Sequence, residues 1–196
     1  YFTTPNWYYS TEFRLLYTQL FMVPLFHIFE DWHVIRVITN VITYLLLLGS
    51  YYYFMKPLKV NRTLVVLSSV ILLLPFSETF VTHMQMGNTY MPHVIIVFFC
   101  FGMFLRLVQQ KKLLEKQNIL LLAAYTSLSI VCGMSGVRYM LALQVPLVLT
   151  AVYFVFCSKA FTKLREEFSK ENLKTVCGGE GILLLLYSIY GAFFAL

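Results

Sequence analysis

The sequence is poor in charged residues. Only 12% of its 196 residues are Asp, Glu, Lys or Arg, whereas roughly a quarter are charged in an ordinary soluble domain. Together with 59% hydrophobic residues and a mean hydropathy of +0.73, this scarcity excludes a typical soluble domain. The apolar runs approach about 20 residues and do not alternate with polar residues, which disfavours a transmembrane β-barrel. The composition therefore predicts an all-α fold, a multi-pass transmembrane helical bundle.

Metal-binding patterns are also lacking. The four cysteines have neither metal-like nor paired spacing, and we expect unpaired, buried thiols; they are Cys100, Cys132, Cys157 and Cys177. His83 and His93 are ten residues apart, which is not a spacing of zinc ligands. We therefore expect no metal site and no cofactor, although a divalent cation stays an open alternative.

Six apolar runs are read as membrane spans, with approximate limits 34–54, 64–80, 91–108, 118–134, 139–157 and 182–196. A further apolar run, 13–29, is interrupted by Pro24 and flanked by charged residues. We expect it to form a helix that lies at the membrane interface, the alternative being another span. The chain would then consist of an outer segment with this helix, 1–33, and a transmembrane bundle, 34–196.

The positive charges are concentrated in the loops after the first, third and fifth predicted spans. These loops hold twelve of the 15 lysines and arginines, so the positive-inside rule predicts that they are cytoplasmic and that the N-terminal segment faces outward. The net charge of +6 is thereby explained without nucleic acid. An outward N-terminus requires a preceding signal or one more helix, and we expect a first span upstream of residue 1. We expect the membrane to be a bacterial plasma membrane.

A polar stripe begins the first predicted span. Glu30, His33, Arg36 and Asn40 follow one another at i, i+3, i+6 and i+10, which places them within an arc of about 120° on a helix. Asp31 points elsewhere and suits the N-terminal cap, where a carboxylate accepts from free amides. For the stripe, two interpretations stay open: polar packing between helices, or the lining of a hydrated site.

Two further outer segments carry ionisable residues. Glu78, His83 and Gln85 lie between the second and third spans, and Arg138 lies between the fourth and fifth. Glu78 is either an interfacial carboxylate or a general base. Arg138 either anchors the protein to lipid headgroups or binds a lipid-linked phosphate, for which a planar guanidinium is well suited. We expect these outer segments to converge in one pocket at the level of the outer headgroups.

Two stretches together resemble a known family. They are PLFHIFEDWHVIRVITNVITYLLLLGSYYYFMK (residues 24–56) and LLLPFSETFVTHMQMGNTYMPHVIIVFFCFGMFLR (residues 72–106). Both are similar to segments of the polytopic C-type (GT-C) glycosyltransferases, which use polyprenyl-phosphate sugars. In the first, a short polar patch precedes Arg36 and a long span ends at Lys56; in the second, Gln85 and Tyr90 fit the family's outer-loop patch. The resemblance extends over residues 10–157.

The resemblance implies an enzyme that moves a sugar from a polyprenyl-phosphate donor to an acceptor at the outer membrane face. This chemistry needs a carboxylate to deprotonate the acceptor hydroxyl and cations to bind the leaving phosphate. Glu78 is the candidate catalytic base. The candidate substrate-binding residues are Arg138, Arg14, Arg36, Glu30, His33, His83 and Gln85. The expected partners are membrane lipids and the polyprenyl-linked donor, with no nucleic acid.

The pattern also departs from the family. Asn88 stands where the family often has arginine, and the usual acidic base would lie on the span expected upstream of residue 1. A transporter or flippase-like bundle is the main alternative, and it predicts charges buried at mid-membrane and interrupted helices. A non-catalytic membrane subunit is the third. The charged residues lie at the ends of the apolar runs, which favours the enzyme.

Overall fold

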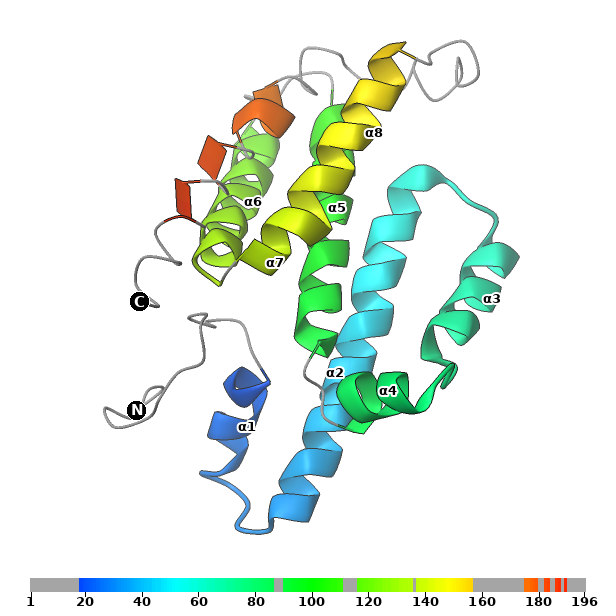
Figure 1. The fold of residues 1–196 in the computed structure, drawn as a ribbon, viewed down its shortest axis with the longest axis vertical. Helices are drawn as coiled ribbons and strands as arrows, with labels where there is room; N and C mark the ends of the chain where they lie inside the picture. The colour runs from blue at the N-terminus through cyan, green and yellow to red at the C-terminus, as the bar shows by residue number, and fades with distance from the viewer. Residues whose placement is uncertain are drawn as a thin grey trace. The chain divides into compact units, whose positions relative to one another are not determined.

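The computed structural model describes residues 18–86, 90–110, 116–135, 137–156, 175–179, 182–183, 186–187 and 189. Within these ranges the regular structure is helical and no strand occurs (Figure 1), which confirms the all-α prediction for them. The α-helices are α1 (Gln19–Leu25), α2 (Trp32–Met55), α3 (Arg62–Leu73), α4 (Glu78–Phe80), α5 (Met91–Gln109), α6 (Lys116–Met134), α7 (Val137–Tyr139) and α8 (Val145–Phe156). A 3₁₀ turn, η1 (Lys56–Leu58), and two π-helices, η2 (Val81–Met86) and η3 (Met140–Gln144), complete the elements.

Two of the described helices are long and apolar enough to cross a membrane: α2 with its following turn, Trp32–Leu58, and α5, Met91–Gln109. At a rise of 1.5 Å per residue, the 24 residues of α2 extend about 36 Å, more than the hydrocarbon thickness of a bilayer. The described part of the chain offers a third span if α3 and the bent segment after it count as one. Asn118–Met134 and Met140–Thr150 are shorter apolar helices. The predicted first and third spans thus correspond to helices of membrane-spanning length.

Helix α2 buries hydroxyl side chains on one face and exposes aliphatic side chains on the other. Its buried residues include three small hydroxyl side chains; they are Ile35, Thr39, Thr43, Leu47, Ser50 and Tyr51. Its exposed side is aliphatic from Val34 through Val41 to Leu45, with Val37 61% and Leu45 65% exposed. Farther along, the aromatic Tyr52 is exposed on the same helix. A helix that exposes aliphatic residues and buries hydroxyls is arranged for an apolar solvent, where small residues let helices approach closely. This arrangement fits lipid around α2.

The core of the first compact unit joins α2 to the first half of α5. Of the described residues, 18–99 belong to this unit, and those from Cys100 onward belong to a second one. Leu47 packs with Met91 and Ile95. One turn farther along both helices, the ring of Phe98 contacts that of Tyr51 edge-on, with the ring centroids 5.3 Å apart. Tyr51, at the end of α2, therefore packs between α2 and α5.

The turn between α2 and α3 is one of the three basic loops. Lys59 adopts the left-handed conformation, with φ of 53°, which reverses the chain after η1. Asn61 then caps α3, its Oδ1 accepting from the backbone N–H of Thr63 at 3.0 Å. Figure 1 shows α3 returning alongside α2, and the hydroxyls of Tyr51 and Ser68 join the two helices at 2.6 Å.

The predicted second span, 64–80, is wrong as one continuous helix. Helix α3 ends at Leu73, and the helical segment that begins at Glu78 is bent from it by 91°. The cause is Pro75, because proline lacks the N–H that a helix needs and drives the preceding residue into extended conformation. Leu74 has φ of −67° and ψ of 138° accordingly. The 12 residues of α3 extend only about 18 Å.

The predicted interfacial helix is also shorter than expected. Its described part, α1, has seven residues and ends at Leu25, whereas the prediction continued to Phe29; residues 13–17 lie outside the described ranges. Pro24 lies inside its last turn. Beyond it, the ring of Phe26 stacks on Trp32 with centroids 5.4 Å apart. Whether α1 lies at a membrane interface stays a prediction.

The second unit contains the later helices. Helix α6 agrees with the predicted span 118–134, and α7, η3 and α8 form a helical run over 137–156 in place of the span predicted at 139–157. The buried side of α6 includes Tyr125, Ser129 and Cys132. Only residues 182–183, 186–187 and 189 of the last predicted span are described, and these are helical.

Candidate functional site

Asp31 is the N-terminal cap of α2. Its carboxylate accepts from the backbone N–H of His33 at 2.8 Å, which satisfies one of the free amides at the helix start. The prediction of a cap is confirmed. Because Asp31 has this local role, it is a weak candidate for chemistry.

The polar stripe that follows lies beside the buried face of α2 and not on it. Glu30 and His33 are exposed, while Arg36 and Asn40 are half-buried. Buried on this stretch of the helix are Ile35 and the threonines that continue its ridge. Glu30 precedes the cap Asp31 and lies outside α2, so the predicted helical stripe is wrong at Glu30. The other three residues pass from an exposed to half-buried positions along the flank of α2, and both interpretations stay open for them.

The buried polar face of α2 is formed by Thr39, Thr43 and Ser50, which the sequence reasoning missed. Thr39 donates to the carbonyl of Ile35 at 2.8 Å, and Thr43 donates to that of Thr39 at 2.9 Å. Each hydroxyl thus finds an acceptor within its own helix. The four-residue spacing of small polar residues in an aliphatic run was the available signal, since i and i+4 share a face.

Glu78 begins α4, directly after the break at Pro75. Ser77 caps this turn, its hydroxyl accepting from the N–H of Phe80 at 3.1 Å. Glu78 is exposed at the surface of the protein. The break is what ends the apolar run and allows a carboxylate to follow it.

Two histidines meet at one tyrosine near this turn. The ring of His83, on η2, lies 6.0 Å from that of Tyr90, and Tyr90 lies 6.1 Å from His93 at the start of α5. The ten-residue spacing gave no reason to join the histidines, although Tyr90 and His93 at i and i+3 share a helical face. An exposed imidazole beside an exposed phenol offers hydrogen-bond donors, acceptors and an aromatic face to a ligand.

The other predicted site residues are described only in part. Arg138 is half-buried in α7 and belongs to the second unit, while Glu78 belongs to the first. Their predicted shared cavity stays a prediction. The side chain of Gln85 and the whole of Arg14 lie outside the described residues.

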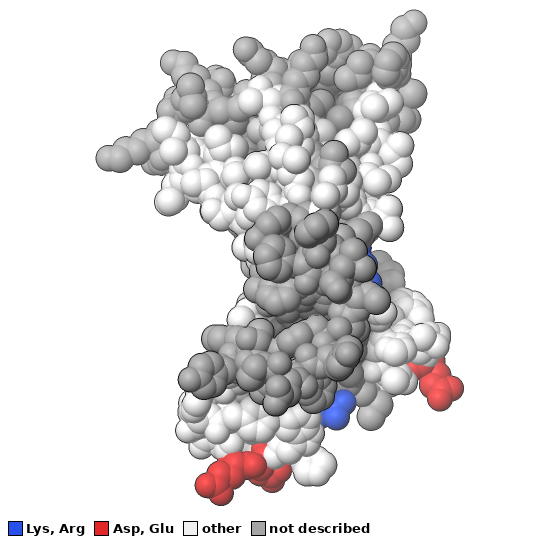
Figure 2. All heavy atoms as spheres, turned by 60° about the vertical axis from the view of Figure 1, so that its left-hand side comes forward, with Lys and Arg blue, Asp and Glu red and all other residues white. Residues whose placement is uncertain are grey.

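Charge is confined to exposed or half-buried positions in the described side chains. The buried polar residues among them are neutral: threonine, serine, asparagine and glutamine. Figure 2 shows the acidic side chains of this face in two separate places on an otherwise largely uncharged described surface. Within the described ranges, no three His, Cys, Asp or Glu residues gather to hold a metal ion.

The cysteines give no sign of catalysis. Cys100 and Cys132 are buried, as predicted, and Cys177 is half-buried; none of these three described cysteines is in a disulfide bond. Cys157 lies outside the described residues. Burial raises the pKa of the Cys177 thiol above its ordinary value, which keeps the thiol neutral and weakly nucleophilic.

No protein family, curated protein or solved structure matches the chain.

Proposed function

We propose that the chain is the membrane core of a polytopic C-type glycosyltransferase. It would transfer a sugar from a polyprenyl-phosphate donor to an acceptor at the outer face of a bacterial plasma membrane. The proposal includes the finer architecture: a bundle of six spans and an interfacial helix, with the N-terminal segment outward and the three basic loops in the cytoplasm.

The position of the charged groups carries the proposal. The described side chains of Asp, Glu, Lys, Arg and His are exposed or half-buried, while the helices that separate them expose aliphatic residues. An enzyme that joins a lipid-linked donor to a polar acceptor needs this combination. Its carboxylates and cations must meet substrate at the membrane surface, because charged groups are costly inside the bilayer.

The surroundings of Glu78 support its role as base. The carboxylate is exposed immediately after the 91° break, and η2 follows with His83 against Tyr90. Tyrosine presents an apolar ring and a polar tip, a combination suited to a sugar, whose ring has an apolar face and a rim of hydroxyls. Glu78 would take the proton of the acceptor hydroxyl as that oxygen bonds to the anomeric carbon. The bond from that carbon to phosphate breaks, and the polyprenyl phosphate leaves with its electron pair.

Arg138 is the proposed partner of the leaving phosphate. Its guanidinium can bind two phosphate oxygens at once, which an ammonium cannot. Charge-assisted hydrogen bonds of this kind stabilise the developing negative charge in the transition state. Arg36, half-buried on the flank of α2, and Arg14 are the secondary candidates for the same phosphate.

The test is transfer of labelled sugar from a polyprenyl phosphate by the full-length protein in reconstituted vesicles. Glu78→Gln should lower the turnover by roughly 10²–10⁴-fold, the contribution of general base catalysis. Arg138→Ala should weaken donor binding by about tenfold to a hundredfold, and Arg138→Lys should recover only part of it.

Arg106→Ala is the matched control. Arg106 is also a half-buried arginine of the second unit, but it lies in the last turn of α5, where it donates to the carbonyl of Gly102 at 2.8 Å. We expect this variant to keep wild-type transfer. If the wild type transfers sugar only at the background rate, the proposal of an enzyme is wrong. If Arg138→Ala and Arg106→Ala lower transfer equally, the proposed role of Arg138 in phosphate binding is wrong.

A transporter is the second candidate, and one observation favours it. The chain is interrupted between α3 and α4, and two π-helices occur, features that often accompany functional sites in membrane helices. Against it stands the neutrality of the buried residues in the described part of the chain, since transporters bind ions and charged substrates at mid-membrane. Flux of a labelled lipid or solute without bond cleavage, in the same vesicles, would favour this candidate.

A further inference from the structure

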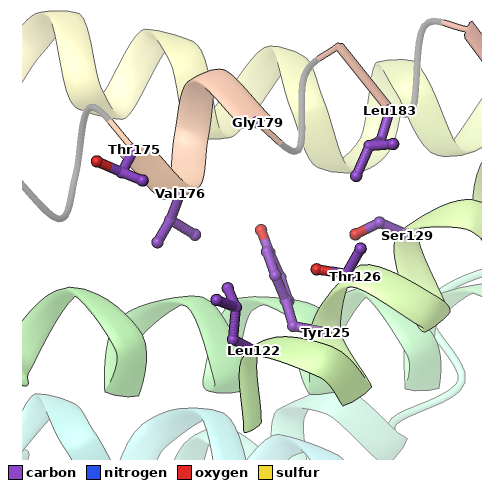
Figure 3. A pocket seen from close by; sticks show the side chains of 8 residues that line it. All are labelled: Leu122, Tyr125, Thr126, Ser129, Thr175, Val176, Gly179 and Leu183. Carbon is purple, nitrogen blue, oxygen red and sulfur yellow. The ribbon is translucent and has the colours of Figure 1, made fainter. Parts of the chain in front are cut away.

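A cavity of about 100 Å³ lies beside α6 in the second unit. Leu122, Tyr125, Thr126 and Ser129 line one side of it, and Val176, Gly179 and their neighbours line the other. Figure 3 shows the phenol oxygen of Tyr125 directed away from α6 toward the segment that carries Val176 and Gly179, with the hydroxyls of Thr126 and Ser129 on the same side. The cavity is therefore bordered by several hydroxyl groups.

The phenol oxygen of Tyr125 is the unusual member of this group. Tyr125 is only 1% exposed, and its Oη has no hydrogen-bond partner in the protein. Buried hydroxyls are nearly always hydrogen-bonded, because losing water without gaining a partner costs free energy. A phenol also cannot turn back to its own helix as a threonine hydroxyl does, since the ring holds the oxygen away from the backbone. A partner is therefore required within the cavity.

The size and lining limit what that partner is. Liquid water fills about 30 Å³ per molecule, so the cavity holds roughly three waters or the hydroxyl end of a short alcohol. It is well below the range of about 300–1,000 Å³ typical of drug-sized ligands, so it does not admit a sugar ring with its substituents. The lining residues include no charged side chain, which leaves neutral molecules.

We propose that this cavity is a binding site for small neutral hydroxylic molecules, in which the hydroxyl of Tyr125 donates a hydrogen bond to the bound oxygen. Water and the hydroxyl group of an alcohol share this chemistry. The site is independent of sugar transfer, and it places polar oxygen atoms beside an apolar helix.

The first test removes only the phenol oxygen. Tyr125→Phe in the full-length protein should lower the apparent Tm by about 2–4 °C, the shift expected for loss of one net hydrogen bond in a chain of this size. Tyr52→Phe is the control, because Tyr52 is 58% exposed on α2, and it should leave the Tm unchanged. A dry cavity predicts the opposite: Tyr125→Phe would then raise the Tm, and this outcome would overturn the proposal.

The second test fills the cavity. A Cβ added at Gly178 or at Gly179 meets nothing within 4 Å, but only Gly179 lines the cavity. Gly179→Leu should therefore occupy the site, and Gly178→Leu is the matched control with the same change of side chain. The probe is 1-propanol, with its binding to the reconstituted protein measured by saturation-transfer NMR.

If the site accepts alcohols, Gly179→Leu should weaken 1-propanol binding at least tenfold while Gly178→Leu retains it. If it holds water alone, propanol binding is the same in both glycine variants, and the Tm loss of Tyr125→Phe disappears in the Gly179→Leu background. Either result supports the site and identifies its source of oxygen. A Tm loss that persists unchanged in the filled variant, without propanol binding at this position, would overturn it.

Discussion

Helices α2 and α6 both bury neutral hydroxyl groups, but they satisfy them differently. In α2, Thr39 and Thr43 donate to carbonyl oxygens four residues earlier in the same helix, at 2.8 and 2.9 Å. In α6, the phenol of Tyr125 is buried without a hydrogen-bond partner in the protein. The hydroxyl of a short threonine side chain reaches a carbonyl oxygen of its own helix. The aromatic ring of tyrosine holds the phenol oxygen too far from the backbone to do so. Side-chain length thus decides whether a buried hydroxyl is satisfied within its own helix or needs a partner from elsewhere, as Tyr51 finds in Ser68.

The largest effect is expected on the closely packed face of α2. Thr39 is completely buried, so Thr39→Leu forces added volume into a packed site and should lower the free energy of unfolding by about 1–3 kcal/mol. Denaturation in detergent micelles, followed by circular dichroism, measures this.

Two substitutions control the experiment on Thr39. Thr39→Val keeps the shape and leaves the carbonyl of Ile35 in its helical hydrogen bond, so we expect a change below about 1 kcal/mol. Val37→Leu adds similar volume on the exposed side of α2, where Val37 is 61% exposed, and should have almost no effect. If Val37→Leu destabilised the protein as much as Thr39→Leu, the assignment of the two faces would be wrong.

A smaller effect is expected at the start of α2, where another short side chain satisfies the backbone locally. Asp31→Ala removes the acceptor of the His33 N–H and should cost about 0.5–2 kcal/mol. Asp31→Asn retains an acceptor oxygen and should cost much less. The same unfolding measurement compares them, and equal losses would mean that the charge of Asp31, and not its hydrogen bond, stabilises the helix.

The smallest effect is expected at Cys177, which follows Val176, a residue that lines the cavity beside α6. Burial raises the pKa of Cys177, so less of it is thiolate at pH 7 than for a free cysteine of pKa about 8.5. Because the neutral thiol is favoured in the folded state, its contribution to stability is complete below the unfolded pKa and is lost as pH rises through the higher folded pKa.

Iodoacetamide alkylation as a function of pH measures this directly. In a Cys157→Ser background, the rate at Cys177 should still rise about tenfold per pH unit where a small free thiol has levelled off. Cys100 and Cys132, both buried, serve as unreactive internal references. A rate that levels off together with that of the free thiol would contradict a raised pKa.

The parts of the fold that could be predicted from the sequence are those governed by local pattern. The apolar runs at 34–54 and 91–108 correspond to α2 and α5, and Asp31 is the expected cap. The 91° break was not predicted, although Pro75 in LLLPFS was its signal. The apolar run 64–80 was predicted to be one span because of its hydropathy. Proline, however, interrupts a helix whatever the hydropathy of the residues around it.

The candidate site was less predictable, because it depends on residues that only folding brings together. The spacing of His83 and His93 suggested no relation, and their contacts with Tyr90 arise from the turn through η2 into α5. The stripe was expected as one arc of a helix, but Glu30 precedes the cap Asp31 and lies outside α2. In the structure its members range from exposed to half-buried, since the side of a helix that is buried depends on its neighbours.

By itself, the sequence determined that this chain is helical and apolar, where its charges interrupt the apolar runs, and that Asp31 caps α2. These properties follow from composition, periodicity and hydrogen bonds between residues a few positions apart. Only the tertiary structure decided that the hydroxyls of α2 face inward and that the aliphatic residues face outward. It also decided that Tyr125 points into a cavity formed with residues some fifty positions later. Burial and cavities are created by packing between distant segments, and no pattern within one helix specifies which segment will cover it.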